Sequence, residues 1–255
     1  MNHKAKKSLG QNFLHDMQFK LKIRDIVAKN YAEFDNLPLV EIGPGLGDLT
    51  EMFIELNKDI ELYELDYDLI EHLENKFGGV RIHNKDFMTE LPNLKPSYLV
   101  SNLPYYIGSR LIIDLIIYNC RYPFSFILQK EVVMKTKKSE KITLFGAMLN
   151  YFYDVKIELN IPPSAFKPAP KVLSTLFSAV PKDTSIDGLQ AINIFKAMFF
   201  KPTKTLYNNL QFGGIEKEDI DKIFEINKWP QNLRINWSNY SDIFDTLYTH
   251  LSGVI

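Results

Sequence analysis

The sequence predicts an α/β fold, with a Rossmann-like parallel sheet followed by a small all-helical C-terminal domain. Three observations predict this architecture. Short apolar runs alternate with longer helical patterns between residues 37 and 128, as is typical of parallel strands joined by right-handed crossovers. A glycine-rich turn follows the first of these runs. From Asp187 onward the pattern is helical.

Each predicted element of the sheet region is an apolar stretch bounded by polar or turn residues. The first helix is expected over residues 17–30, where apolar side chains recur among charges. Strands are expected at 37–42, 59–64, 80–83, 98–101 and 124–128. Helices are expected between them at 49–56, 66–77 and 111–118, with another after Glu131.

The pattern changes after about residue 150. Two extended runs, 151–159 and 172–180, flank a proline-rich segment and are expected to form an antiparallel edge of the sheet. Helical patterns then follow at 189–200, 205–211, 218–226 and 240–251. We therefore predict two domains. Residues 1–184 form the Rossmann-like domain, with a basic N-terminal loop and helix at 1–30, and residues 185–255 form the helical domain.

The composition excludes several classes of protein. The 255 residues are 45% hydrophobic and 24% charged with a net charge of −1, which excludes disordered and collagen-like chains. No stretch has the roughly 18 apolar residues of a membrane span, and residues 1–14 contain no apolar signal core. We therefore expect a cytoplasmic protein with no membrane partner. One cysteine, Cys120, excludes an internal disulfide, and five scattered histidines argue against a metal site.

Charge is distributed unevenly along the chain. Residues 1–30 carry seven bases and two acids, residues 31–129 carry seven bases and sixteen acids, and residues 130–150 carry five bases and two acids. Residues 162–204 hold six lysines and two acids. Basic segments around an acidic middle suit a polyanion partner. Solvated surface faces have the same pattern, so charge leaves both interpretations open.

The glycine-rich turn lies within Val40-Glu-Ile-Gly-Pro-Gly-Leu-Gly-Asp48. Gly43 and Gly45 permit a tight turn and the close approach of a ligand to the backbone. Glu64 ends the next strand, where a carboxylate accepts hydrogen bonds from ribose hydroxyls. Asp86 ends the third strand–helix unit and is placed to bind an adenine amine. Together these residues predict a site for an adenosine-bearing cofactor.

The spacing and charge of this turn favour S-adenosyl-L-methionine over a dinucleotide. Dinucleotide sites have G-x-G-x-x-G and hold a pyrophosphate at a helix N-terminus. Here the pattern is G-x-G-x-G between Glu41 and Asp48. Acidic side chains repel a pyrophosphate and attract the sulfonium and ammonium groups of S-adenosylmethionine. A nicotinamide oxidoreductase is the weaker alternative, because no residue for hydride transfer is evident.

A second motif, Val100-Ser-Asn-Leu-Pro-Tyr-Tyr-Ile107, follows the fourth predicted strand. The Asn102 side-chain oxygen and the Leu103 carbonyl are placed to accept the two N–H groups of an adenine amine and to aim its lone pair at a methyl group. Pro104 shapes the turn, and the Tyr105 ring is placed to stack on an extruded base. Orientation then supplies most of the catalysis.

A third segment, Lys7-Ser-Leu-Gly-Gln-Asn-Phe-Leu14, combines basic residues, a glycine and two amide side chains. This pattern indicates a loop that closes over a ligand. A basic tail has the same composition, so both interpretations stay open for the segment taken alone.

Together these motifs resemble the ribosomal RNA adenine dimethyltransferases, and among them the small-subunit (KsgA/RsmA) type. The segments that carry the resemblance are GQNFL (10–14), VEIGPGLGDLT (40–50), ELD (64–66), SNLPYYI (101–107), LQKEVV (128–133), PPSAFKPAPKV (162–172) and KTLYNNL (204–210). They span nearly the whole chain in the order found in the family.

The resemblance implies a Rossmann-like S-adenosylmethionine-dependent methyltransferase that dimethylates two adjacent adenosines in a hairpin loop near the 3′ end of small-subunit (16S) rRNA. It also implies a role in small-subunit biogenesis with the pre-30S particle as partner, and we expect a monomer. The implied cofactor-binding residues are Asn12, Leu14, Gly43, Gly45, Glu64, Asp86 and Asn102. The implied catalytic residues are Asn102, Leu103, Pro104, Tyr105 and Phe166, with Phe166 closing on the base from the other side.

The chain departs from the family pattern in three places. Lys201-Pro-Thr-Lys204 stands where consecutive arginines are expected, residues 141–146 lack an arginine, and Leu173 stands where an aspartate is expected. None of these departures lies among the residues predicted for methyl transfer. They affect positions that the resemblance links to rRNA binding. Two alternatives stay open: a large-subunit rRNA adenine methyltransferase, and a ribosome-assembly factor whose catalysis is dispensable.

Overall fold

The computed structural model describes residues 12–104 and 107–252. The chain forms two compact units. The first contains residues up to 115 together with 120–133 and 154–181, and the second contains 116–119, 134–153 and the chain from 182 onward. The domain limits predicted from the sequence, 1–184 and 185–255, stay a prediction.

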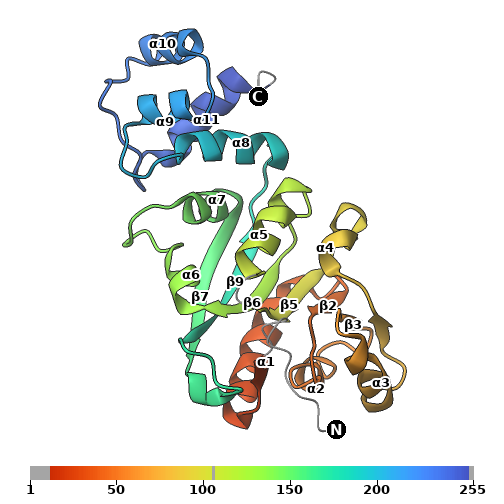
Figure 1. Cartoon of the computed structure of the whole chain (residues 1–255). Coiled ribbons are helices and arrows are strands. Elements are labelled where there is room, and N and C mark those ends of the chain that lie inside the picture. Colours follow the sequence, from red (N-terminus) through yellow and green to blue (C-terminus); the bar gives the residue numbers. More distant parts are fainter. Residues whose placement is uncertain (1–11, 105–106, 253–255) are drawn as a thin grey trace. The chain divides into compact units, whose positions relative to one another are not determined.

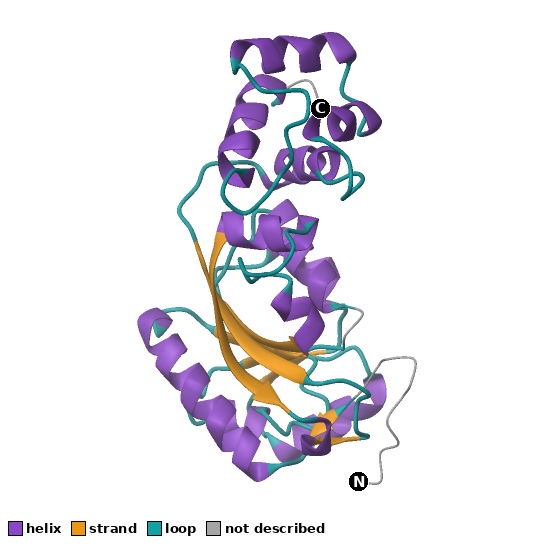
Figure 2. Ribbon diagram, turned by 90° about the vertical axis from the view of Figure 1, so that its left-hand side faces the viewer, coloured by secondary structure: helices purple, strands orange, loops and turns teal. Residues whose placement is uncertain are grey.

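The first unit is built around a seven-stranded sheet with the strand order β4-β3-β2-β5-β6-β9-β7. Its strands are β2 (Leu39–Ile42), β3 (Glu61–Tyr63), β4 (Arg81–His83), β5 (Tyr98–Asn102), β6 (Phe124–Gln129), β7 (Tyr153–Ile161) and β9 (Ser174–Pro181). The strands from β4 to β6 are parallel to their neighbours, whereas β9 runs antiparallel to β6. Helices cover both faces of the sheet (Figures 1 and 2). The predicted Rossmann-like α/β class is confirmed.

Helices connect the parallel strands, and three helices of this unit begin at a capping aspartate. The α-helices of this region are α1 (Met17–Tyr31), α2 (Thr50–Phe53), α3 (Tyr67–Lys76), α4 (Phe87–Glu90), α5 (Gly108–Ile117) and α6 (Lys130–Met134), and the short 3₁₀ helices are η2 (Ala32–Phe34) and η3 (Leu91–Asn93). The side chains of Asp16, Asp66 and Asp86 accept hydrogen bonds from backbone N–H groups in the first turns of α1, α3 and α4. Asp66 and Asp86 therefore fix where the chain turns after β3 and β4.

The central strands are buried because a parallel sheet is covered on both faces. All four residues of β2 are buried, and so are the first four residues of β5. Apolar residues such as Ile23, Leu62 and Leu73 fill the core between the sheet and its helices. Glu41 is an exception within β2, because its carboxyl-bearing side chain is only 2% exposed. Acidic side chains are rarely buried unless they have a partner, so packing alone does not explain why the central strand holds Glu41.

A short two-stranded sheet joins segments that lie far apart in the sequence. β1 (Phe13–Leu14) pairs antiparallel with β8 (Phe166–Lys167), in a register that places Leu14 opposite Phe166. The 3₁₀ helix η4 (Pro163–Ala165) precedes β8, and the Ala165 carbonyl accepts a 3.0 Å hydrogen bond from the His15 N–H. The proline-rich segment therefore holds the N-terminal segment in place.

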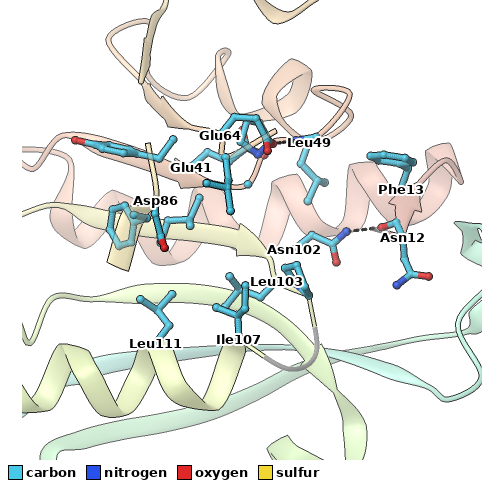
Figure 3. A pocket seen from close by; sticks show the side chains of 18 of the residues that line it. Asn12, Phe13, Glu41, Leu49, Glu64, Asp86, Asn102, Leu103, Ile107 and Leu111 are labelled. Carbon is cyan, nitrogen blue, oxygen red and sulfur yellow. Dashed lines mark hydrogen bonds between the residues drawn. The ribbon is translucent and has the colours of Figure 1, made fainter. Parts of the chain in front are cut away.

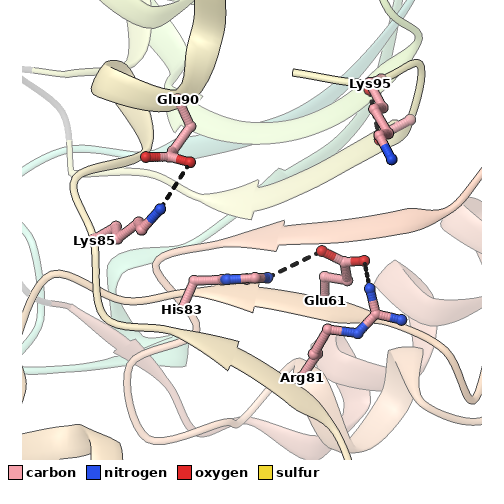
Figure 4. Close-up of polar contacts among 7 residues, drawn as sticks. Glu61, Arg81, His83, Lys85, Glu90 and Lys95 are labelled. Atoms are coloured by element: carbon pink, nitrogen blue, oxygen red, sulfur yellow. Dashed lines mark hydrogen bonds and ion pairs between the residues drawn. The ribbon is translucent and has the colours of Figure 1, made fainter. Parts of the chain in front are cut away.

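The outer strand β4 has charged side chains along the sheet edge. Glu61 on β3 lies 2.5 Å from Arg81 and 3.0 Å from His83 on β4, and Lys85 lies 3.2 Å from Glu90 (Figure 4). Such partly exposed pairs contribute little to stability. Arg81 and His83 lie on the edge strand β4, where polar side chains hinder pairing with a strand of another molecule.

The second unit is helical. Its helices are α7 (Leu144–Phe152), α8 (Gly188–Met198), α9 (Leu206–Phe212), α10 (Lys217–Ile226) and α11 (Tyr240–Leu251). Phe195 on α8 stacks on Phe244 on α11 with ring centroids 4.3 Å apart, and Tyr151 on α7 meets both rings edge-on. These aromatic contacts join three of the helices. Among the residues that the structure describes, no helix has the length and apolar character to span a bilayer.

Candidate active site

A pocket lies at the carboxyl ends of the parallel strands (Figure 3). The strand β2 pairs with β3 on one side and with β5 on the other. Ligands of open α/β sheets bind at such a switch point. The pocket is lined by residues 12–14, 41–45, 48, 49, 63–65, 85–88, 102–104, 107 and 111. The N-terminal segment and the loops after β2, β3, β4 and β5 thus meet at one place.

The turn after β2 has a backbone conformation that favours glycine. Gly43 and Gly45 have φ angles of +65° and +61°, which are strained for residues with a Cβ. A Cβ added to Gly43 would meet no atom within 4 Å, whereas one added to Gly45 would lie 2.8 Å from the Phe13 ring. Gly45 is therefore needed both for the turn and for the packing of the N-terminal segment.

Glu64 connects the turn to the end of β3. Its side chain is 5% exposed, and its two oxygens accept hydrogen bonds from the backbone N–H groups of Gly45 (3.0 Å) and Asp66 (2.8 Å). Burial raises the pKa of Glu64, while these two hydrogen bonds oppose that rise. Because each carboxylate oxygen has two lone pairs, Glu64 retains capacity to accept hydrogen bonds from ribose hydroxyls.

Four carboxyl groups line the pocket, those of Glu41, Asp48, Glu64 and Asp86. The Asp48 carboxylate lies 2.5 Å from the buried ammonium of Lys20, which offsets one negative charge. The pocket-lining Lys85 pairs with Glu90. The remaining acidic groups favour a cationic ligand over a pyrophosphate.

Glu41 is the most deeply buried of these acids. The Thr50 hydroxyl donates a 2.6 Å hydrogen bond to its Oε2. The pKa of Glu41 is raised to about 8, chiefly by burial and to a smaller extent by the nearby charges of Glu64 and Asp48. A cation bound in the pocket would favour the ionised form of this carboxyl group.

Asp86 caps α4 and also lines the pocket. Its Oδ1 accepts a 3.0 Å hydrogen bond from the Met88 N–H, so the cap fixes the carboxyl group at the pocket wall. The apolar side chains of Leu65, Met88 and Ile107 line the same pocket. An acceptor beside apolar walls suits a purine ring with an exocyclic amine.

The Asn102 side chain is oriented by the N-terminal segment. Its Nδ2 donates a 2.9 Å hydrogen bond to the Asn12 carbonyl (Figure 3). Because a carbonyl oxygen only accepts hydrogen bonds, the amide nitrogen must face Asn12, and the Asn102 Oδ1 points the other way. Leu103 and Pro104 follow in the pocket wall. Tyr105 lies outside the described residues, and so do residues 10 and 11 of the GQNFL motif.

The structure brings most of the predicted site residues together. Those that line the pocket are Asn12, Leu14, Gly43, Gly45, Glu64, Asp86, Asn102, Leu103 and Pro104. Phe166 is placed differently: it is 3% exposed, belongs to the apolar core and pairs with Leu14, and it is not among the described residues that line the pocket. The predicted role of Phe166 against the target base stays a prediction.

Several residues in the pocket wall or in contact with it received no role in the sequence analysis. Phe13 packs on Gly45, Thr50 binds Glu41, and Lys20 pairs with Asp48. The contacts of Phe13 and Lys20 join residues that are distant in sequence and leave no local pattern. The place of Leu65 in the pocket could have been predicted from the sequence, because Leu65 directly follows Glu64, the residue predicted to bind the ribose. Across the described part of the chain, no three or more His, Cys, Asp or Glu side chains form a group that could hold a metal ion.

The fold and the pocket define a class of protein. The Rossmann-like sheet carries an acidic, glycine-lined site for an adenosine and, next to it, an Asn-Leu-Pro turn. This combination defines an S-adenosylmethionine-dependent methyltransferase. The acidic lining suits the sulfonium and ammonium groups, Glu64 suits the ribose, and Asp86 suits the adenine amine. The residues present therefore fit this cofactor.

Comparison with known proteins identifies the family. The family model described as Ribosomal RNA adenine dimethylase matches residues 2–242. The chain therefore belongs to this family, and it is an rRNA adenine dimethyltransferase that uses S-adenosylmethionine. A protein from Sulfurimonas denitrificans named Ribosomal RNA small subunit methyltransferase A is 33% identical, over 94% of this chain and 92% of its own length. A protein of the same name from Helicobacter pylori is 30% identical, over 98% and 99%.

Two solved structures share the fold. The 23S rRNA methyltransferase ErmE superposes with a TM-score of 0.67 at 20% identity, over 94% of this chain and 100% of its own. A dimethyladenosine transferase from Plasmodium falciparum superposes with a TM-score of 0.66 at 21% identity, over 94% and 89%. At these identities the likeness extends to the fold alone.

Proposed function

We propose that this protein transfers methyl groups from S-adenosylmethionine to the exocyclic amines of two adjacent adenosines in a hairpin loop near the 3′ end of small-subunit (16S) rRNA. The observation that carries the proposal is the orientation of the Asn102 amide, whose nitrogen is bound to Asn12. Its oxygen is thereby available within the pocket to accept a hydrogen bond from an adenine amine.

The chemistry follows from that orientation. An adenine amine is a poor nucleophile because its lone pair is delocalised into the ring. When the Asn102 Oδ1 and the Leu103 carbonyl accept its two N–H groups, the nitrogen is held towards a pyramidal geometry with its lone pair directed outward. The bound cofactor supplies a methyl group on a positively charged sulfur, which is already a good leaving group. No strong base is required, and the amine proton passes to water. Positioning therefore supplies most of the rate.

The assignment to the small subunit is supported by the relatives. Proteins that align over nearly the whole chain at 30–33% identity are named Ribosomal RNA small subunit methyltransferase A. The fold does not decide between the two rRNAs, because a 23S rRNA methyltransferase shares it. We accordingly propose the pre-30S particle as the partner, a role in small-subunit biogenesis in the cytoplasm, and a monomeric enzyme.

Methyl transfer to defined RNAs tests this proposal. The purified protein is incubated with tritiated S-adenosylmethionine and unmethylated small subunits, naked 16S rRNA or 23S rRNA, and primer extension locates the methylated adenosines. We expect methylation of two adjacent adenosines near the 3′ end of 16S rRNA. Methylation of 23S rRNA alone would favour the large-subunit alternative and contradict the proposal.

The Asn102→Ala variant tests the catalytic role. At saturating cofactor it is expected to lose at least about a hundredfold in methylation rate, because misplacement of a reacting group costs about that much. The matched control is Asn93→Ala, since Asn93 is exposed and does not line the pocket. Normal subunit assembly with the inactive Asn102→Ala protein would instead identify an assembly factor whose catalysis is dispensable.

A further inference from the structure

A lysine lies on the buried face of the helix that follows the N-terminal segment. The buried residues of α1 are Lys20, Ile23, Val27 and Tyr31, which have the spacing of one helix face. Lys20 is only 5% exposed. A lysine is almost never buried to this extent unless its ammonium is paired. The place of Lys20 on an otherwise apolar face therefore requires a specific partner.

The partner of Lys20 is Asp48, in the wall of the cofactor pocket. The Lys20 Nζ lies 2.5 Å from the Asp48 Oδ1, and the two side chains are 7% and 25% exposed. Asp48 lines the pocket, whereas Lys20 is not among the described residues that line it. Replacing a buried ion pair by apolar side chains commonly leaves stability unchanged or raises it. Stability therefore does not explain the pair, and its place behind the pocket wall indicates a role toward the ligand.

The second carboxylate oxygen of Asp48 is available to a ligand. Among the described residues, none donates a hydrogen bond to the Asp48 Oδ2. Two other acids of the pocket differ in this respect. Glu64 accepts backbone hydrogen bonds at both of its oxygens, and the more deeply buried Glu41 accepts one from Thr50. Asp48 therefore offers the pocket an acceptor for which no described donor competes.

The position of Asp48 along the pocket indicates which part of the ligand it meets. Figure 3 shows Asp86 at one end of the pocket and Phe13 at the other, with Glu64 between them. Leu49, the neighbour of Asp48 in the chain, lies on the Phe13 side of Glu64 (Figure 3). With the adenine at Asp86 and the ribose at Glu64, the Phe13 end is left for the amino-acid part of the cofactor. Asp48 belongs to this end.

We propose that the Lys20–Asp48 pair recognises the zwitterionic amino-acid end of S-adenosylmethionine. The Asp48 Oδ2 accepts a hydrogen bond from the cofactor's ammonium, and the Lys20 charge offsets the repulsion between Asp48 and the cofactor's carboxylate. A neutral ion pair suits a zwitterion, whereas a lone aspartate would attract one of its charges and repel the other. The inference rests on the proposed function only through the cofactor and its predicted placement at Glu64 and Asp86, and it does not depend on which RNA is methylated.

Calorimetric titration of the purified protein with three related ligands tests the pair. S-adenosylhomocysteine carries the ammonium and the carboxylate, S-adenosyl-3-thiopropylamine carries only the ammonium, and 5′-methylthioadenosine carries neither. Asp48→Asn should weaken binding of the first two by about 10- to 100-fold, as for the loss of a hydrogen bond between charged groups, and leave binding of the third unchanged. The control is Glu51→Gln, which removes an acid that pairs with Lys76 at 2.7 Å and is not among the described residues of the pocket wall.

Two further variants separate recognition from folding. Lys20→Met/Asp48→Asn leaves no unpaired buried charge and should weaken the same two ligands by a similar factor, so the test holds even if Asp48→Asn does not fold. Lys20→Met leaves the Asp48 charge without its partner. The ratio of the Kd for S-adenosylhomocysteine to the Kd for the thiopropylamine should then rise about two- to fivefold, because only the first ligand has a carboxylate for Asp48 to repel. A purely structural role of Lys20 would not change this ratio.

Three outcomes would overturn the proposal. The Asp48→Asn and double variants could bind S-adenosylhomocysteine as tightly as Glu51→Gln does. They could also bind all three ligands equally weakly, which would show that the pair only maintains the shape of the pocket. Weak binding of S-adenosylhomocysteine with unchanged binding of the thiopropylamine would show that Asp48 affects the carboxylate instead. Because the titrations contain no RNA, a protein that gives the expected result but methylates no small-subunit rRNA would contradict the proposed function alone.

Discussion

At the scale of single residues, the pocket contains two buried acids whose partners differ. Glu64 accepts two backbone hydrogen bonds, which oppose the effect of burial on its pKa. Glu41 accepts a hydrogen bond from Thr50, but it also lies near the negative charges of Glu64 and Asp48. Burial, together with these negative charges, raises its pKa to about 8, so near neutral pH much of the cofactor-free protein is expected to carry Glu41 in its protonated form.

The pKa of Glu41 predicts how stability depends on pH. Consider a carboxyl group whose pKa is higher in the folded protein than in the unfolded chain. It makes its full contribution to stability at pH values below the pKa of the unfolded chain. That contribution is lost as the pH rises from about 4.5 to about 8. Without cofactor, the wild type should therefore lose unfolding free energy relative to Glu41→Gln over this range, by on the order of a few kcal/mol.

Urea unfolding of the two proteins at several pH values measures this difference. Thr50→Val is a useful companion variant, because it removes the hydroxyl that donates to Glu41 and should raise the Glu41 pKa further. Parallel stability profiles for the wild type and Glu41→Gln would show that the Glu41 carboxyl group does not titrate in this range.

At the scale of elements, two substitutions in the glycine-rich turn separate the effect of backbone strain from the effect of crowding against a neighbouring side chain. Gly43→Ala adds a Cβ at positive φ with no atom within 4 Å, whereas Gly45→Ala adds one at a similar φ only 2.8 Å from the Phe13 ring. We expect Gly43→Ala to lower the unfolding free energy by about 1–2 kcal/mol through backbone strain. Gly45→Ala should cost more and should also weaken S-adenosylmethionine binding, because Phe13 must move.

Calorimetric titration of the cofactor and thermal unfolding test this pair. The double variant Phe13→Ala/Gly45→Ala provides the control, since it removes the crowded ring and keeps the strain. Its stability loss should then be smaller than the sum of the two single losses. Equal effects of Gly43→Ala and Gly45→Ala would show that contact with Phe13 does not matter.

The elements that the sequence predicts well are those with local patterns. The five parallel strands occur where apolar runs stand between turn residues, and the last helix, Tyr240–Leu251, has the predicted bounds. The helix predicted after Glu131 occurs as α6, but the pattern does not predict the separate helix α7, which begins after the capping residue Thr143. Loop residues 135–143 between them carry no periodic signal that would place this break.

The features of the site that the sequence does not predict depend on contacts between residues far apart in the chain. Asp86 and Glu64 follow strand ends, so their shared position at the sheet edge is predictable from topology. The pairing of Leu14 with Phe166 depends on two short segments of the chain that meet only in the folded protein. For the same reason, no local pattern indicates that the Asn12 carbonyl orients the Asn102 amide.

At the scale of the whole molecule, the two units have different chemistry. The described residues that line the acidic cofactor pocket lie between 12 and 111, within the first unit. The exposed side chains of Phe200 and Phe212 belong to the second. The net charge of −1 for the entire chain therefore does not show that the carboxyl groups of the cofactor pocket are concentrated in the first unit.

This division predicts which part of the chain S-adenosylmethionine stabilises. A ligand at a hundred times its Kd adds about 2.7 kcal/mol to the stability of the unit that binds it. In hydrogen–deuterium exchange, amides of β2, β3 and β5 should therefore exchange up to about a hundredfold more slowly with cofactor, while amides of α8 to α11 should be unaffected. Glu64→Ala should abolish the protection at the same cofactor concentration. Equal protection of both units would show instead that they open as one cooperative body.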